Sequence, residues 1–211
     1  MTLELGGKSP NIIFSDANLP EAAKWAAFGV YENMGQSCSA GTRILVQDEV
    51  YDEFTKLFVA ATEAFKVGSP ADVDTFQGPQ VSKVQFEKIL GYIEEGKKGG
   101  AKLLTGGGRH GTRGYYVQPT VFGDVTNDMK IAKEEIFGPV AAVLRFNTEE
   151  EAIKIANDTE VSRTALRGCV GEGSLWQYGL GAAVHTLNAN RLQRVTRKLK
   201  AGTVWQNQVG S

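Results

Sequence analysis

The stretch NIIFSDANLPEAAKWAAFGVYENMGQSCSAGTRILV, residues 11–46, decides the fold of this chain. Residues 11–14 are a short apolar run that predicts a buried strand. Pro20 stands in the first turn of a predicted helix that runs to about Asn33. Residues 43–46 predict a second strand. A strand, a helix and a strand in succession are typical of an α/β domain.

The same alternation continues along the rest of the chain. From Glu49, apolar residues recur every three or four positions, which predicts an amphipathic helix. Residues 96–114 are rich in glycine and are predicted to be a turn-rich surface stretch. The order of elements predicts a largely parallel sheet. The other predicted elements are a helix around 86–93, strands at 115–125 and 140–146, a helix from Thr148 to about Asn157, a strand at 181–186, a helix around 192–199 and a strand at 203–207.

Composition and charge argue against several classes of function. The formal net charge of −1 gives no electrostatic case for binding nucleic acid or an anionic membrane surface. No apolar run approaches the ~20 residues that span a membrane. Two cysteines, Cys38 and Cys169, make no disulfide framework, so we expect a reducing compartment, the cytoplasm or the mitochondrial matrix. Two histidines, His110 and His185, leave no evident metal site.

Two short segments carry groups with catalytic chemistry. Residues 3–10 (LELGGKSP) hold the carboxylate of Glu4, and residues 33–38 (NMGQSC) hold the thiol of Cys38. A thiolate can attack an electrophilic carbon, and a carboxylate can activate the water that releases the product. We expect a helix to begin near Cys38. Its N-terminus would favour the thiolate form of the cysteine. The alternatives are a small buried cysteine and a solvated glutamate near the chain terminus.

These segments resemble the glutamate and cysteine active-site signatures of the aldehyde dehydrogenase superfamily, in particular its broad-specificity NAD-dependent enzymes. A third block, KEEIFGP at residues 133–139, resembles the family too. The resemblance covers residues 2–160 and 178–207. It implies that residues 1–211 are a three-layer α/β/α catalytic domain with a largely parallel sheet, without the family's N-terminal NAD-binding half and C-terminal segment. Shorter matches in the family's order are GPQ at 78–80, QPTV at 118–121 and AGTVW at 201–205.

The resemblance implies the roles of the two reactive groups. Cys38 attacks the aldehyde carbon, the thiohemiacetal passes a hydride to the nicotinamide, and a thioester remains on the sulfur. Glu4 prepares the water that hydrolyses this thioester. The implied cofactor is NAD, or NADP, the implied partner is a small-molecule aldehyde, and the full-length protein is implied to be a homo-oligomer. Lys8, within the first segment, is interpreted as a structural surface residue.

The remaining site residues are also implied by the resemblance. Glu135 accepts hydrogen bonds from the nicotinamide ribose, and the ring of Phe137 packs near the nicotinamide. The backbone of Leu5 and Gly6 approaches the nicotinamide ring. Asn207 matches an asparagine close to the active site. From spacing alone, Phe137 could equally be a core aromatic and Glu135 part of a helix surface.

Residues 161–177 (VSRTALRGCVGEGSLWQ) interrupt the resemblance. They have neither a helical nor a strand period. Joining Glu160 directly to Tyr178 gives continuous family-like sequence. Our hypothesis is that these residues are a translated intron, because Val-Ser can be encoded GTGAGT and Gln can be encoded CAG. The alternative is a genuine surface insertion, which a loop tolerates well.

Three functional hypotheses remain open from the sequence. The resemblance implies an oxidoreductase that converts an aldehyde to a carboxylic acid with NAD. No glycine-rich phosphate-binding loop leads from a predicted strand into a predicted helix, so we expect the isolated chain to be inactive in this reaction. The alternatives are a non-enzymatic fragment, acting as an antigen or interaction module, and a cofactor-independent thiol esterase.

Overall fold

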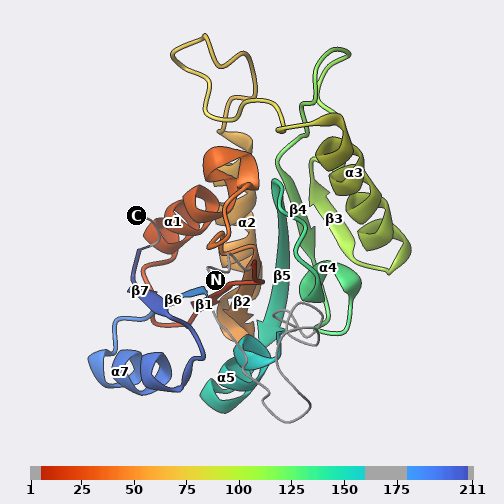
Figure 1. Cartoon of the computed structure of the whole chain (residues 1–211). Coiled ribbons are helices and arrows are strands. Elements are labelled where there is room, and N and C mark those ends of the chain that lie inside the picture. Colours follow the sequence, from red (N-terminus) through yellow and green to blue (C-terminus); the bar gives the residue numbers. More distant parts are fainter. Residues whose placement is uncertain (1–5, 160–179, 209–211) are drawn as a thin grey trace, which may run out of the picture.

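A computed structural model describes residues 6–159 and 180–208. Within these residues the centre of the molecule is a seven-stranded sheet with the order β3-β4-β5-β2-β1-β6-β7 (Figure 1). Neighbouring strands run parallel, except β3 and β4, which are antiparallel. The strands are β1 (Pro10–Ile13), β2 (Arg43–Gln47), β3 (Lys102–Thr105), β4 (Thr120–Gly123), β5 (Val140–Phe146), β6 (Gly181–His185) and β7 (Thr203–Gln206).

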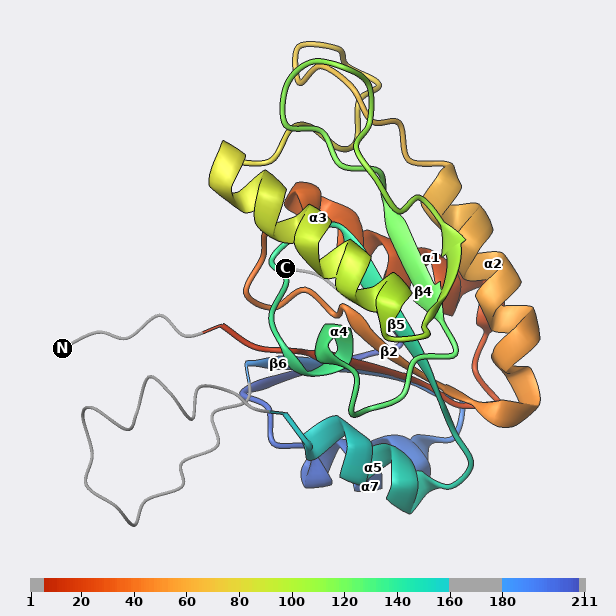
Figure 2. The same ribbon diagram turned by 90° about the vertical axis from the view of Figure 1, so that its right-hand side faces the viewer.

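Helices cover both faces of this sheet (Figures 1 and 2). On one face, α1 and α2 pack over a core that includes Ile13 and Val143. On the other face, α3, α4, α5 and α7 pack over a core that includes Ile12 and Leu144. Adjacent residues of one strand thus face opposite cores, which confirms the three-layer α/β/α fold. The helices are α1 (Leu19–Tyr31), α2 (Tyr51–Glu63), α3 (Lys83–Lys98), α4 (Lys130–Lys133), α5 (Glu149–Asn157) and α7 (Ala189–Lys198), with 3₁₀ turns η1 (Glu32–Gly35) and η2 (Asp48–Val50).

Side-chain caps fix where several helices begin. Asn18 accepts a hydrogen bond from the backbone of Glu21, and a proline occupies the first turn of α1. Thr148 caps α5 in the same way, and Ser82 caps α3. The predicted cap at Thr148 and the predicted strand at residues 140–146 are both confirmed. Among the described residues, no helix is both long and apolar enough to cross a membrane.

Two predictions on the β3–β4 side of the sheet agree only in part with the structure. The glycine-rich stretch 96–114 is not only turns, because it contains β3. This strand has half-exposed side chains and forms through its pairing with β4, a contact that local composition does not encode. The strand predicted at 115–125 is shorter, because only Thr120–Gly123 belongs to β4. Tyr115 lies outside the sheet and accepts a hydrogen bond from the backbone of Gln80.

Candidate active site

Three segments that precede neighbouring strands meet at the amino edge of the sheet. Residues 6–9 lead into β1, residues 36–42 into β2, and residues 134–139 into β5. Because β1, β2 and β5 are adjacent and parallel, their starts lie together. This edge collects four predicted site residues; two others, Glu4 and Leu5, lie outside the described residues. The four are Gly6, Cys38, Glu135 and Phe137.

The carboxylate of Glu135 rests on the glycine turn before β1. Its Oε1 accepts a hydrogen bond of 3.3 Å from the backbone N–H of Gly7. A Cβ on Gly6 would overlap the same carboxylate, which would then have to move away. Glu135 lies past the end of α4, in a loop, and is half-buried. The fold therefore brings the backbone of Gly7 together with the carboxylate of Glu135, which lies 128 positions later in the chain.

Lys8 is buried, so its interpretation as a surface residue is wrong. Its side chain is 3% exposed, and its Nζ has no hydrogen-bond partner among the described residues. The pKa of Lys8 is lowered to about 7, first by burial and then by the nearby charge of Arg43, while Glu135 opposes the shift. The turn that holds the Glu135 carboxylate thus also brings an amine into the protein interior. The sequence gives little sign of this, because a lysine beside two glycines is usually exposed.

Cys38 lies in an exposed turn between η1 and β2. The backbone N–H of Ala40 donates to the carbonyl of Ser37 over 3.1 Å and closes this turn. The hydroxyls of Ser37 and Ser39, the residues before and after Cys38, lie 3.2 Å apart and hydrogen-bond to each other. The expected helix start at Cys38 is wrong, because η1 ends at Gly35 and the next regular element is a strand. The thiol is accessible and lies in a turn rather than at the start of a helix.

Three of the five non-glycine residues with left-handed backbone among the described residues lie in the two loops of this edge. Asn33, Met34 and Gly35 have φ of 50°, 59° and 69°, and Phe137 has φ of 56°. Such angles are strained for residues other than glycine and persist only where neighbours hold them. Gly35 backs directly onto Gly138: a Cβ on it would overlap the Gly138 carbonyl and lie 2.7 Å from the next backbone nitrogen.

Arg43, at the start of β2, is a second buried cation that sequence reasoning missed. It is fully buried and donates to the carbonyls of Ile155 at 2.9 Å, Ala156 at 2.7 Å and Asp158 at 3.3 Å, and to the Asn127 side chain at 3.1 Å. These carbonyls end α5, so the guanidinium caps that helix at its negative pole. Burial lowers the pKa of Arg43 to about 10, and Asp158 opposes the shift.

Asn207 lies at the other edge. β7 is parallel to β6, and Asn207 follows its last residue, so it is at the carboxyl ends of the strands. Its Oδ1 accepts a 2.9 Å hydrogen bond from the backbone N–H of Thr186, and its own N–H donates to the carbonyl of Val184 over 2.9 Å. The structure therefore does not bring Asn207 together with Cys38 and Glu135.

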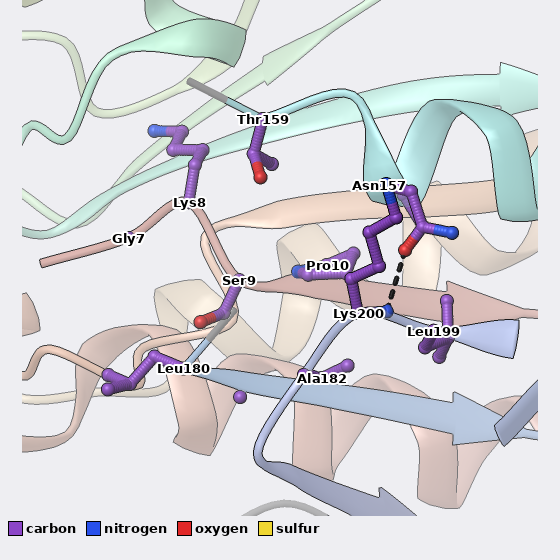
Figure 3. A pocket seen from close by; sticks show the side chains of 13 residues that line it. Gly7, Lys8, Ser9, Pro10, Asn157, Thr159, Leu180, Ala182, Leu199 and Lys200 are labelled. Carbon is purple, nitrogen blue, oxygen red and sulfur yellow. Dashed lines mark hydrogen bonds between the residues drawn. The ribbon is translucent and has the colours of Figure 1, made fainter. Parts of the chain in front are cut away.

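A small cavity lies between the start of β1, the end of α5 and the start of β6 (Figure 3). Its volume of about 20 Å³ holds one water molecule, not a substrate. Thr159 and Leu180, which flank the undescribed residues 160–179, both line it, so the two flanks lie close together. The predicted insertion at 161–177 itself lies outside the described residues. Nearby, the backbone N–H of Lys200 donates to Asn157 over 2.8 Å.

Histidines and acidic residues form no metal centre in the part of the chain that the structure describes, where no group of three or more potential ligands comes together. His185, at the end of β6, is buried, and burial lowers its pKa to about 4.

The fold and this edge define an α/β domain of the three-layer class. The chain belongs to the aldehyde dehydrogenase family, since the sequence model described as "Aldehyde dehydrogenase family" matches residues 1–170.

Relatives of known name agree with this family. The "Aldehyde dehydrogenase" of Emericella nidulans is 55% identical over 207 residues, which cover 98% of this chain and 38% of that protein. "Aldehyde dehydrogenase, mitochondrial" of Homo sapiens is 50% identical over 98% of this chain and 37% of its own length. The NAD⁺ complex of aldehyde dehydrogenase from Bacillus cereus superposes with a TM-score of 0.89 at 47% identity, over 100% of this chain and 39% of that one. The chain thus spans about 38% of the length of the curated relatives it matches.

Proposed function

We propose that this chain carries the catalytic residues of an NAD-dependent aldehyde oxidation. The observation that supports this most is the pairing, at one edge of the sheet, of an accessible thiol with a carboxylate that rests on a glycine turn. A solved relative from Bacillus cereus is an NAD⁺ complex, which supports NAD as the cofactor. NADP remains the second candidate, and a small-molecule aldehyde is the substrate class.

The residues at this edge suit the nicotinamide half of the cofactor. The described hydrogen bond to Glu135 uses Oε1, which leaves Oε2 to accept a bond from a ribose hydroxyl. Phe137, two residues further on, is half-buried and has a left-handed backbone. Gly6 presents bare backbone. When bound, NAD supplies a two-electron acceptor for a hydride.

Cys38 performs the covalent chemistry in this proposal. Its thiolate attacks the aldehyde carbon, and the new C–S bond gives a thiohemiacetal whose oxygen carries the developing charge. The backbone N–H of Cys38 stabilises this charge. After oxidation of that carbon, the acyl group stays on sulfur as a thioester. Glu4 takes a proton from water, the resulting hydroxide attacks the thioester carbonyl, and the C–S bond breaks to release the carboxylic acid and the thiolate.

The whole protein's activity needs parts beyond this chain. The chain covers about 38% of its relatives, so we expect the isolated chain to produce no measurable NADH with an aldehyde. Hydride transfer needs the reacting atoms held ~3–3.5 Å apart, which requires the rest of the cofactor site. We propose that the full protein is a homo-oligomer of the cytoplasm or the mitochondrial matrix; one relative is named as mitochondrial.

Acyl transfer to the thiol tests the proposal in the isolated chain. We expect p-nitrophenyl acetate to acetylate Cys38 in preference to Cys169, and peptide mass mapping measures both sites. Cys38→Ser removes the thioester, while Cys169→Ser serves as the matched control and leaves it. Preferential acetylation of Cys169 would argue for a non-enzymatic fragment. Repeated turnover without cofactor, lost in Cys38→Ser, would favour the thiol esterase.

A further inference from the structure

The first turn of α3 and the residue before its cap contact the two loops of the candidate site. The Nε2 of Gln85 donates to the carbonyl of Ile136 at 3.0 Å and to that of Phe137 at 2.7 Å. The Oε1 of Gln36, two residues before the thiol, accepts a 3.1 Å hydrogen bond from the backbone N–H of Val81. Figure 2 shows the start of α3 on the same side of the molecule as the start of β1.

The two loops also touch each other. Gly35 meets the backbone at Gly138 so closely that even a methyl group has no room. A displacement of residues 136–138 therefore pushes or releases the segment that leads into Cys38. The contact is between backbones, so it has little freedom to adapt by side-chain rotation.

Gln85 holds the loop in which Phe137 is strained. Phe137 has φ of 56°, and both amide hydrogens of Gln85 are used on the carbonyls at and before that residue. Without these donors, the two half-buried carbonyls can turn towards water, and the left-handed angle loses a restraint. The backbone of Gln85 is itself fixed, because its N–H donates to the cap Ser82 over 3.2 Å.

We propose that Gln85 is a positioning residue that holds the Phe137 loop and, through the contact of Gly138 with Gly35, the turn that presents Cys38. The inference rests on the proposed function, in which Phe137 contacts the cofactor and Cys38 the substrate. The start of α3 would then hold in place both the cofactor-contacting loop of Phe137 and the turn that presents Cys38. Gln85 itself needs no contact with substrate for this role.

Native-state hydrogen exchange of the 211-residue chain measures this coupling. The amides of Gln36 and Ala40 donate to local carbonyls at 3.0 and 3.1 Å, on either side of Cys38, and neither bonds to Gln85. Gln85→Met keeps the side-chain length and removes the donors. We expect exchange at both amides to rise about threefold or more relative to the α5 amide of Ala152, which donates to the Thr148 carbonyl and contacts neither loop.

Two further variants complete the test. Gln85→Lys restores N–H donors at a similar length and should return both rates most of the way to the wild-type values. Gln193→Ala, at an exposed glutamine of α7, is the matched control and should change neither ratio. Unchanged ratios in Gln85→Met, or a rise that Gln85→Lys does not reverse, would overturn the positioning role. Acetylation that misses Cys38 would instead contradict the proposed function and leave this coupling result intact.

Discussion

The two edges of the sheet differ in how their polar groups are satisfied. At the carboxyl edge, Asp16 accepts from the Thr186 hydroxyl at 2.7 Å and from Arg191 at 2.9 Å, and Asn207 binds the neighbouring backbone. At the amino edge, the Nζ of Lys8 and the hydroxyl of Ser9 are buried without hydrogen-bond partners among the described residues. The carboxyl edge is bonded mainly to itself, although the Nε2 of His185 there is also buried without a partner among the described residues. The amino edge holds the unpaired amine of Lys8 beside the left-handed backbone of Phe137.

This difference teaches that fold class alone does not locate the site. In open parallel α/β sheets, ligands usually bind outside the carboxyl ends of the strands, where the strand order reverses. Here that point lies between β1 and β6, since β2 is on one side of β1 and β6 on the other. The residues with chemistry gather at the opposite ends. The position of particular side chains, rather than the topology, decides which edge is functional.

Gly35→Ala should have the largest effect on stability, because it disrupts the backbone contact between the two loops of the amino edge. Gly35 has φ of 69°, and a Cβ there would overlap the Gly138 carbonyl. We expect the free energy of unfolding to fall by about 3 kcal/mol or more. Gly91→Ala in α3, where a Cβ meets open space, is the control and should stabilise by about 0.5–1 kcal/mol. Urea unfolding of both variants measures the difference; equal effects would contradict the tight contact.

Lys8→Met should have the next largest effect on the free energy of unfolding, and this variant should be more stable than the wild type. The pKa of Lys8 is about 7 in the fold and 10.5 for an ordinary lysine. Between these values the unfolded chain binds the extra proton, so the stability of the wild type rises with pH from about 7 to 10.5. Removing the amine should stabilise the fold by roughly 1–3 kcal/mol at pH 7 and flatten this rise. Denaturant midpoints of both proteins across this range test it, and parallel pH curves would refute a buried amine.

Asn207→Ala should weaken the carboxyl edge without affecting the thiol. The change removes the acceptor for the Thr186 N–H and leaves a left-handed residue with φ of 56°. We expect a loss of about 1–2 kcal/mol in unfolding free energy. The rate of Cys38 acetylation in the folded variant should equal that of the wild type. A slower acetylation would place Asn207 in the site after all.

Deletion of residues 161–177 should have the smallest effect. Thr159 and Leu180 line the same cavity, so the residues left between them, Glu160, Tyr178 and Gly179, have a short gap to bridge. Each doubling of loop length costs only about 0.6 kcal/mol, so stability should change by less than about 1 kcal/mol. Thermal unfolding of the deletion variant measures this. Separately, a codon other than CAG for Gln177, or mature transcripts that keep these codons, would reject the intron hypothesis.

The regular part of the fold was well predicted, because local sequence patterns encode it. The strand at 140–146 is almost uniformly apolar, and Thr148 has the chemistry of a helix cap. β3 escaped prediction because its exposed residues stand among glycines and depend on β4. Propensity is a weak guide where pairing decides the structure.

The sequence predicted which residues belong to the candidate site, but not their burial or their contacts. Motif resemblance selected Glu135 and Cys38, and both lie at the same edge. The burial of Lys8 and the contacts of Gln85 depend on residues far away in the chain, which no local pattern carries. The helix predicted to start at Cys38 is absent for the same reason: local sequence does not decide which element follows the turn. A Gly-Gln turn predicts where a helix ends, but it does not predict which element comes next.

One titration tests most directly whether the amino edge is the functional one. Nicotinamide mononucleotide carries the nicotinamide ribose without the adenosine half of NAD, so it should reach this edge in the isolated chain. With the ¹⁵N-labelled chain, we predict saturable amide shifts at Gly6, Gly7 and Phe137, and none at Thr186 or Asn207. Shifts confined to the carboxyl edge, or no shift at either edge at saturating ligand, would contradict the account.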